Sequence, residues 1–110
     1  MYLHVTSDRS AIVGDPEDCT ALSVRIDDRL ISEAQLHEAM QGIGVTYSDN
    51  EIGLLANELR RRARVALGPA WEPAWDDRFD AMINYARTRG WYDPTTGTVT
   101  AHIEIAPDTA

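Results

Sequence analysis

The feature that most constrains the fold of this chain is a series of apolar residues at helical spacing. A helix-capping pattern precedes it and a Gly-Pro pair follows it. Ser48-Asp49-Asn50-Glu51 has the composition of a capping box, in which the serine and glutamate side chains each bind a backbone amide. Gly68-Pro69 ends the run, because proline disfavours helical geometry in the residue before it. The pattern predicts one helix over residues 48–67, whose core-facing stripe is Ile52, Leu55, Ala56, Leu59, Ala63, Ala66 and Leu67.

Two more helices are predicted on either side of this one. Ser32-Glu33-Ala34-Gln35 is a second capping box, and it opens a helix that Gly42 and Gly44 end. Another helix is expected to begin near Asp76 and to end at Gly90, which suits the left-handed residue just past a helix. The apolar face of that last helix comprises Trp75, Phe79, Met82, Ile83 and Ala86.

Strands are predicted where apolar and polar residues alternate. Residues 22–26 and 98–105 show this alternation, and residues 2–5 form a plausible short strand. Asp93-Pro94-Thr95-Thr96-Gly97 has the residues of a type I turn followed by a left-handed glycine, and it would join Trp91-Tyr92 to the last strand as a hairpin. Residues 7–20 are interpreted mainly as an acidic loop.

These elements predict a single α+β domain over residues 1–110, with a strand and acidic loop at 1–20, a compact core at 21–105 and a frayed tail at 106–110. In one topology, the N-terminal strands and the C-terminal hairpin form a small antiparallel sheet covered by a three-helix core. In the other, residues 31–105 form a winged-helix-like core. Its short first strand would be residues 45–46 and its wing residues 91–105.

Composition narrows the functional classes. The net charge of −8 counts against non-specific binding to nucleic acid or to anionic membranes, although nucleic acid stays open as a partner. All ten basic residues are arginine. Cys19 is the single cysteine, which excludes an intrachain disulfide and a cysteine-cluster metal site. With no basic-apolar leader and no long apolar run, we expect a cytoplasmic protein that does not enter a membrane.

The main functional hypothesis is a non-catalytic protein-interaction module, acting as an accessory, regulatory or inhibitory subunit. No nucleophile elbow, phosphate loop or cofactor motif is present in the sequence, so we expect no cofactor and favour a binding role. On the predicted helix 48–67, Glu58 and Arg62 are spaced for an ion pair. The expected contact surface, for another protein or for a second copy of the chain, is Leu54, Arg61, Arg64, Val65 and Trp71.

Three alternatives remain open at this stage. A winged-helix regulator would contact DNA through Arg78, Arg87 and Arg89, although the same helix carries acidic residues. A small metal-dependent enzyme would use His4, His102 and Glu104, a two-histidine and carboxylate set that would assemble if the first and last strands paired. An acidic inhibitor that mimics DNA is also compatible with the net charge, but no residues localise that role.

Overall fold

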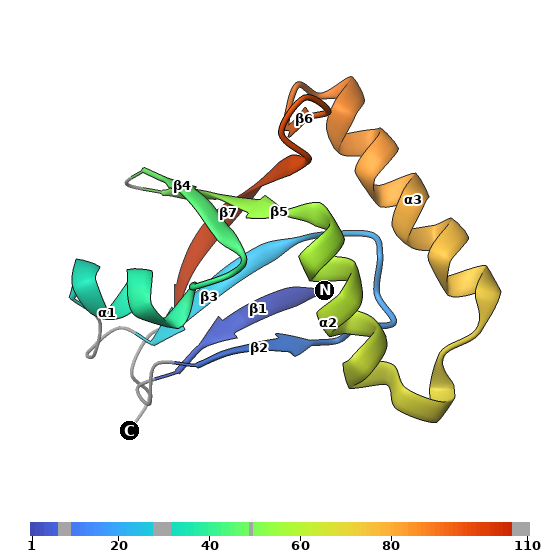
Figure 1. The fold of residues 1–110 in the computed structure, drawn as a ribbon, viewed down its shortest axis with the longest axis horizontal. Helices are drawn as coiled ribbons and strands as arrows, with labels where there is room; N and C mark the ends of the chain where they lie inside the picture. Colours follow the sequence, from blue (N-terminus) through green and yellow to red (C-terminus); the bar gives the residue numbers. More distant parts are fainter. Residues whose placement is uncertain (7–9, 28–31, 49, 107–110) are drawn as a thin grey trace.

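A computed structural model describes residues 1–6, 10–27, 32–48 and 50–106 of the chain, and within this part a curled, mixed β-sheet dominates the fold (Figure 1). The order of its strands is β2-β1-β3-β7-β5-β4, and β6 pairs with part of β7. The strands are β1 (Tyr2–Val5), β2 (Ala11–Gly14), β3 (Ser23–Asp27), β4 (Gly44–Tyr47), β5 (Glu51–Leu55), β6 (Tyr92–Asp93) and β7 (Thr98–Ala106). The helices are α1 (Glu33–Ala39), α2 (Ala56–Leu67), the 3₁₀ turn η1 (Gly68–Ala70) and α3 (Pro73–Thr88).

The expected fold class is wrong in both of its versions. The sheet is neither small nor purely antiparallel, because β1 pairs with β3 and β3 pairs with β7 in parallel. The helices pack around this sheet and do not form a three-helix core or a winged helix. The loop prediction for residues 7–20 missed strand β2, which pairs with β1, whereas residues 15–20 form no helix or strand. The expected frayed tail lies outside the described residues, except for Ala106 at the end of β7.

The decisive difference is at residues 51–55, which form strand β5 rather than the first turns of a helix. The Ser48 backbone N–H and hydroxyl both donate to the Glu51 carbonyl, at 2.9 and 3.1 Å, and so close the β4–β5 hairpin. The apolar stretch that follows Glu51 suits a buried strand as well as a helix. Pairing with β7 selects the strand, and the helix begins only at Ala56, whose N–H donates to Gly97.

Local signals elsewhere are confirmed. Ser32 and Gln35 form both hydrogen bonds of a capping box at the start of α1. Gly68 ends α2 with a φ of 54°, and Gly90 follows α3 with a φ of 78°. Helix α3 begins at Pro73, slightly earlier than expected, because proline is well suited to the first helical turn. Gly97 closes the turn before β7 by donating its N–H to Asp93.

The core lies between one face of the sheet and the helices. Strands contribute Leu3, Val24 and Leu54, each fully buried, and α2 covers them with Leu59 and its neighbours. Helix α3 adds Trp75 and Phe79, whose rings lie 5.3 Å apart. The buried Trp75 indole N–H donates to the Pro16 carbonyl at 2.7 Å, which satisfies its only polar group. Within the described residues, no helix combines the length and apolar character that crossing a membrane requires.

We predict that Leu54→Ala lowers the free energy of unfolding by about 2–5 kcal/mol, as expected for truncating a fully buried leucine. Val65→Ala, on the exposed face of α2, is the matched control and should change it by less than about 0.5 kcal/mol. Urea denaturation at neutral pH measures both. Equal effects from the two variants would contradict the placement of Leu54 in a buried strand.

Candidate interaction surface

Of the residues predicted to form the contact surface, those on α2 are exposed and Leu54 is buried. Its inward face is Ala56, Leu59, Ala63 and Leu67, so Arg61, Arg64 and Val65 point away from the core. Val65 is 70% exposed, as the surface hypothesis requires. Leu54 is not part of that surface, because it lies on β5 and not on the helix, and its side chain is fully buried.

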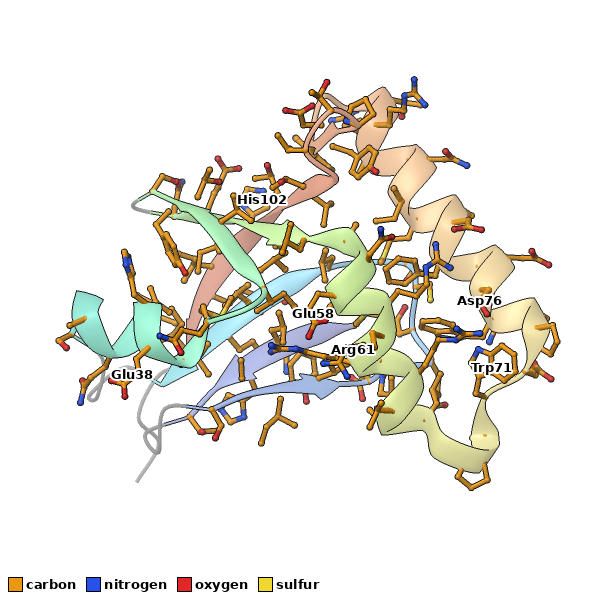
Figure 2. The ribbon with its side chains drawn as sticks, in the orientation of Figure 1. Glu38, Glu58, Arg61, Trp71, Asp76 and His102 are labelled. Atoms are coloured by element: carbon orange, nitrogen blue, oxygen red, sulfur yellow. The ribbon has the colours of Figure 1, made fainter. Side chains whose placement is uncertain are left out.

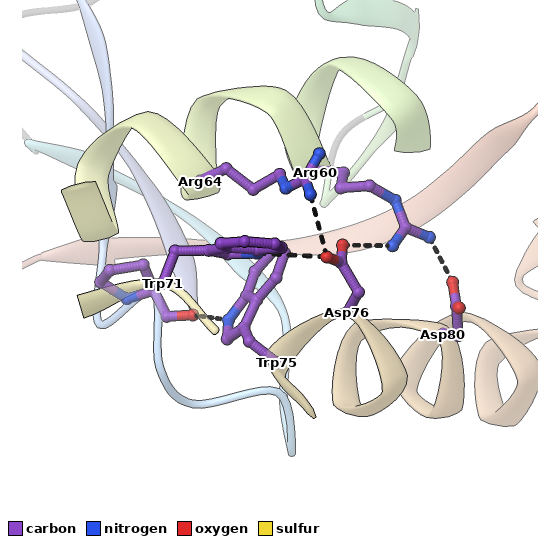
Figure 3. A network of polar contacts seen from close by, with 7 residues as sticks. Arg60, Arg64, Trp71, Trp75, Asp76 and Asp80 are labelled. Atoms are coloured by element: carbon purple, nitrogen blue, oxygen red, sulfur yellow. Dashed lines mark hydrogen bonds and ion pairs between the residues drawn. The ribbon is translucent and has the colours of Figure 1, made fainter. Parts of the chain in front are cut away.

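The carboxylate of Asp76, in the first turn of α3, accepts hydrogen bonds from side chains of α2 and of the turn that follows it (Figure 3). Arg60 donates to Asp76 Oδ1 at 2.9 Å, while Arg64 and the Trp71 indole N–H each donate to Oδ2 at 3.1 Å. Arg60 also pairs with Asp80, one turn further along α3. We refer to Asp76, Arg60, Arg64, Trp71 and Asp80 as the Asp76 network. It ties α2 to α3 across the intervening turn.

The network keeps Asp76 ionised. Desolvation raises the pKa of this carboxyl, but the hydrogen bonds from Arg60 and Trp71 and the charge of Arg64 together outweigh it, so the pKa of Asp76 lies below its ordinary value. An ionised carboxylate accepts all three donors at once. The side chains that meet there are therefore held in one arrangement.

Trp71 is consequently a fixed, half-buried aromatic residue. The Arg64 guanidinium lies 4.5 Å above the centre of its ring, in cation–π geometry, while Asp76 holds the indole N–H. A shallow depression of about 540 Å³ lies between Trp71 and the outer face of α2, with Val65 on its border. Trp71, Val65, Arg61 and Arg64 border the same hollow, and we call these four residues the Trp71 surface.

The arginines of α2 are not a free basic patch. Glu58 accepts two hydrogen bonds from Arg61, at 2.8 and 2.6 Å, and one from Arg62 at 2.8 Å (Figure 2 shows Glu58 and Arg61). The predicted Glu58–Arg62 pair is therefore confirmed. The hydrogen bonds from Arg61 and Arg62 lower the pKa of Glu58 from its ordinary value of 4.5 to about 2. Arg60 and Arg64 are paired with Asp76 in the same way.

The histidine and glutamate set does not assemble. Its premise is wrong, because β3 lies between β1 and β7, and the first and last strands do not pair. Arg25 of β3 stands opposite both His4 and Glu104 and forms an ion pair with Glu104 at 3.4 Å. His102 instead lies 3.9 Å from the carboxylate of Glu51. Among the residues that the structure describes, no three histidine, cysteine or acidic side chains are grouped to hold a metal ion.

The arginines assigned to DNA contact do not form a recognition helix. Arg78 pairs with Glu72, and the Arg89 guanidinium packs 5.3 Å above the Trp91 ring. Arg87 lies in the last turn of α3, the same helix that carries Asp76 and Asp80 in its first half. Because the fold is not a winged helix, the expected groove-reading geometry is wrong.

Comparisons with protein-family models, curated proteins and solved structures find no match to this chain. The site is therefore described from its own residues. Sequence reasoning placed Asp76 only at a helix start and missed its role in fixing Trp71. The available signal was the position of an acid in the first helical turn, five residues after a tryptophan and close to a helix rich in arginine.

We predict that Glu58→Gln lowers stability at neutral pH, by less than about 1 kcal/mol for each ion pair, and that this loss disappears in acid. The folded-state pKa of about 2 lies below the ordinary 4.5, so the pairs stabilise the fold fully above pH 4.5. Their contribution declines as the pH falls towards 2, because the unfolded chain takes up the proton first. Urea denaturation at several pH values measures the difference. Glu17→Gln, on an exposed loop, is the control, and a pH-independent difference would contradict the assignment.

Proposed function

We propose that this protein is a non-catalytic binding module that recognises another protein through the Trp71 surface. In this role it would act as an accessory, regulatory or inhibitory subunit. The observation that carries the proposal is that one carboxylate, Asp76, holds Trp71 and Arg64 in place beside the exposed side chain of Val65. Side chains that are held in this way and partly exposed are suited to contact with a partner.

The chemistry of these residues favours a protein as the partner. Tryptophan and arginine are the residue types most enriched among those that dominate binding energy at protein interfaces. A side chain that is already fixed loses little conformational freedom on association, so less of the contact energy is offset by ordering. The depression beside Trp71 would take an apolar side chain of the partner. Arg61 has five N–H donors, of which Glu58 takes two, and it can donate the others to acceptors on the partner.

The charges of this protein disfavour nucleic acid and a second copy of the chain as the partner. A nucleic acid backbone needs unneutralised positive charge, whereas the arginines of α2 are already paired with Glu58, Asp76 and Asp80. A second copy of this chain carries the same net charge of −8, and long-range repulsion opposes its approach. A different protein is therefore the favoured partner.

The test uses the full chain as bait in a lysate of its native host, with and without nuclease, followed by binding measurements with the purified partner. We predict that Val65→Glu and Trp71→Ala each weaken that binding by roughly 30-fold, the loss typical of an interface hot spot. Val65→Glu is informative even if Trp71→Ala destabilises the fold, because Val65 is exposed on the helix.

The matched control is Val45→Glu, the same change at a 45% exposed valine on β4, which should leave binding unchanged. A partner that binds the Val65→Glu variant as tightly as the unmodified protein would contradict the proposal. Partners that disappear on nuclease treatment would contradict it too, and so would an empty capture.

A further inference from the structure

A second concavity lies between α3 and the sheet, away from the Trp71 surface. Its volume is about 460 Å³, within the usual range for sites that bind small organic molecules. Five segments supply its walls: the residues just before β3, the start of β5, the second half of α3, Trp91 and the middle of β7. It shares no lining residue with the depression beside Trp71. We call it the α3–sheet cleft.

Most of the cleft is apolar and aromatic. Leu22, Met82 and Val99 line its interior, and Tyr85 and Trp91 form one side with their rings edge to face, 6.1 Å between centres. These two residues are 52% and 38% exposed, so the protein itself leaves part of their surface uncovered. The guanidinium of Arg89 lies 5.3 Å from the centre of the Trp91 ring.

Cys19 also lines the cleft, and its side chain there is uncharged. Desolvation raises the pKa of its thiol and outweighs the lowering effect of the nearby positive charges of Arg78 and the N-terminus. At neutral pH the sulfur is therefore a thiol, which packs like a small apolar group. This argues against a nucleophile in the cleft and for a binding role.

The charged group of the lining lies beside a histidine. His102 of β7, labelled in Figure 2, has its Nδ1 3.9 Å from Oε2 of Glu51, and its ring meets the edge of Trp91. Among the described residues that line the cleft, Glu51 is the only aspartate, glutamate, lysine or arginine. A ligand in the cleft thus meets the rings of Tyr85 and Trp91 and the single carboxylate of Glu51.

The geometry points to a binding site for a small ring-containing molecule that carries a protonated amine. Its ring would lie among Tyr85, Trp91 and Met82, and its ammonium group would donate to the carboxylate of Glu51. Charge decides against an anionic ligand, because no arginine lines the cleft and the chain as a whole carries a net charge of −8. The volume matches that of sites that bind small organic molecules, and we therefore take a small ligand as the occupant.

The test is a titration of isotope-labelled full-length protein, followed by two-dimensional NMR at the indole N–H of Trp91. The probes are ring-bearing amines, each compared with its alcohol and its carboxylate analogue, beginning with 2-phenylethylamine, 2-phenylethanol and 3-phenylpropionate. We predict a saturable shift of the Trp91 signal with amines and affinities that fall from amine to alcohol to carboxylate. Glu51→Gln should weaken amine binding by at least about tenfold, because it removes a charge-assisted hydrogen bond.

Two further variants separate binding in the cleft from general charge effects. Asp77→Asn removes one carboxylate from the exposed face of α3, outside the cleft, and should leave amine affinity unchanged. Ala81→Phe fills the cleft from an exposed position on α3 and should abolish binding without lowering the unfolding midpoint. The proposal is overturned if no amine of the panel gives a saturable shift, if carboxylates bind as tightly as amines, or if Glu51→Gln behaves like Asp77→Asn.

Discussion

The rest of the structure depends on the backbone pairing of β7 with β3 on one side and β5 on the other. This last strand lies inside the sheet, parallel to one neighbour and antiparallel to the other, so the two halves of the sheet meet only through it. Without β7, the inner edges of β3 and β5 would leave unpaired N–H and C=O groups. The position of β7 also sets where α3 must lie, because only a short β6 and its turn separate the end of that helix from the strand.

The two faces of β7 have different functions. Val99 and Ala101 are buried with Ile52 and Leu54 of β5, and Val99 also borders the cleft. The alternate residues Thr100 and His102 belong to the opposite face of the strand. A shift of the pairing by one residue would exchange these sets and expose the core. The burial of Val99 and Ala101 therefore fixes the register that brings His102 opposite Glu51. The α3–sheet cleft is thus a consequence of the same pairing that stabilises the fold.

How far the sequence predicts this structure depends on how local each signal is. The capping box at Ser32, the ends of α2 and α3, and the turn before Gly97 are decided within a few residues, and they are confirmed. Residues 51–55 were predicted wrongly because their apolar pattern is compatible with both helix and strand, and a partner distant in sequence decides between them. The Ser48–Glu51 pattern was real, but its hydrogen bonds close a hairpin instead of capping a helix.

For the candidate sites too, the features set by local sequence could be predicted and those set by distant segments could not. Helical spacing places Val65 opposite the core stripe, and the structure shows it 70% exposed within α2, whereas Leu54 lies just before that helix begins. The Asp76 network and the α3–sheet cleft could not be predicted from any single segment, because each is formed by elements that are distant in sequence.

The two sites differ in how their acidic residues are paired. Around α2 the carboxylates of Glu58 and Asp76 are paired with arginines, and Asp76 also holds the indole of Trp71. In the cleft, the described lining residues include no arginine, and the carboxylate of Glu51, with His102 3.9 Å away, is the group proposed to bind a cationic ligand.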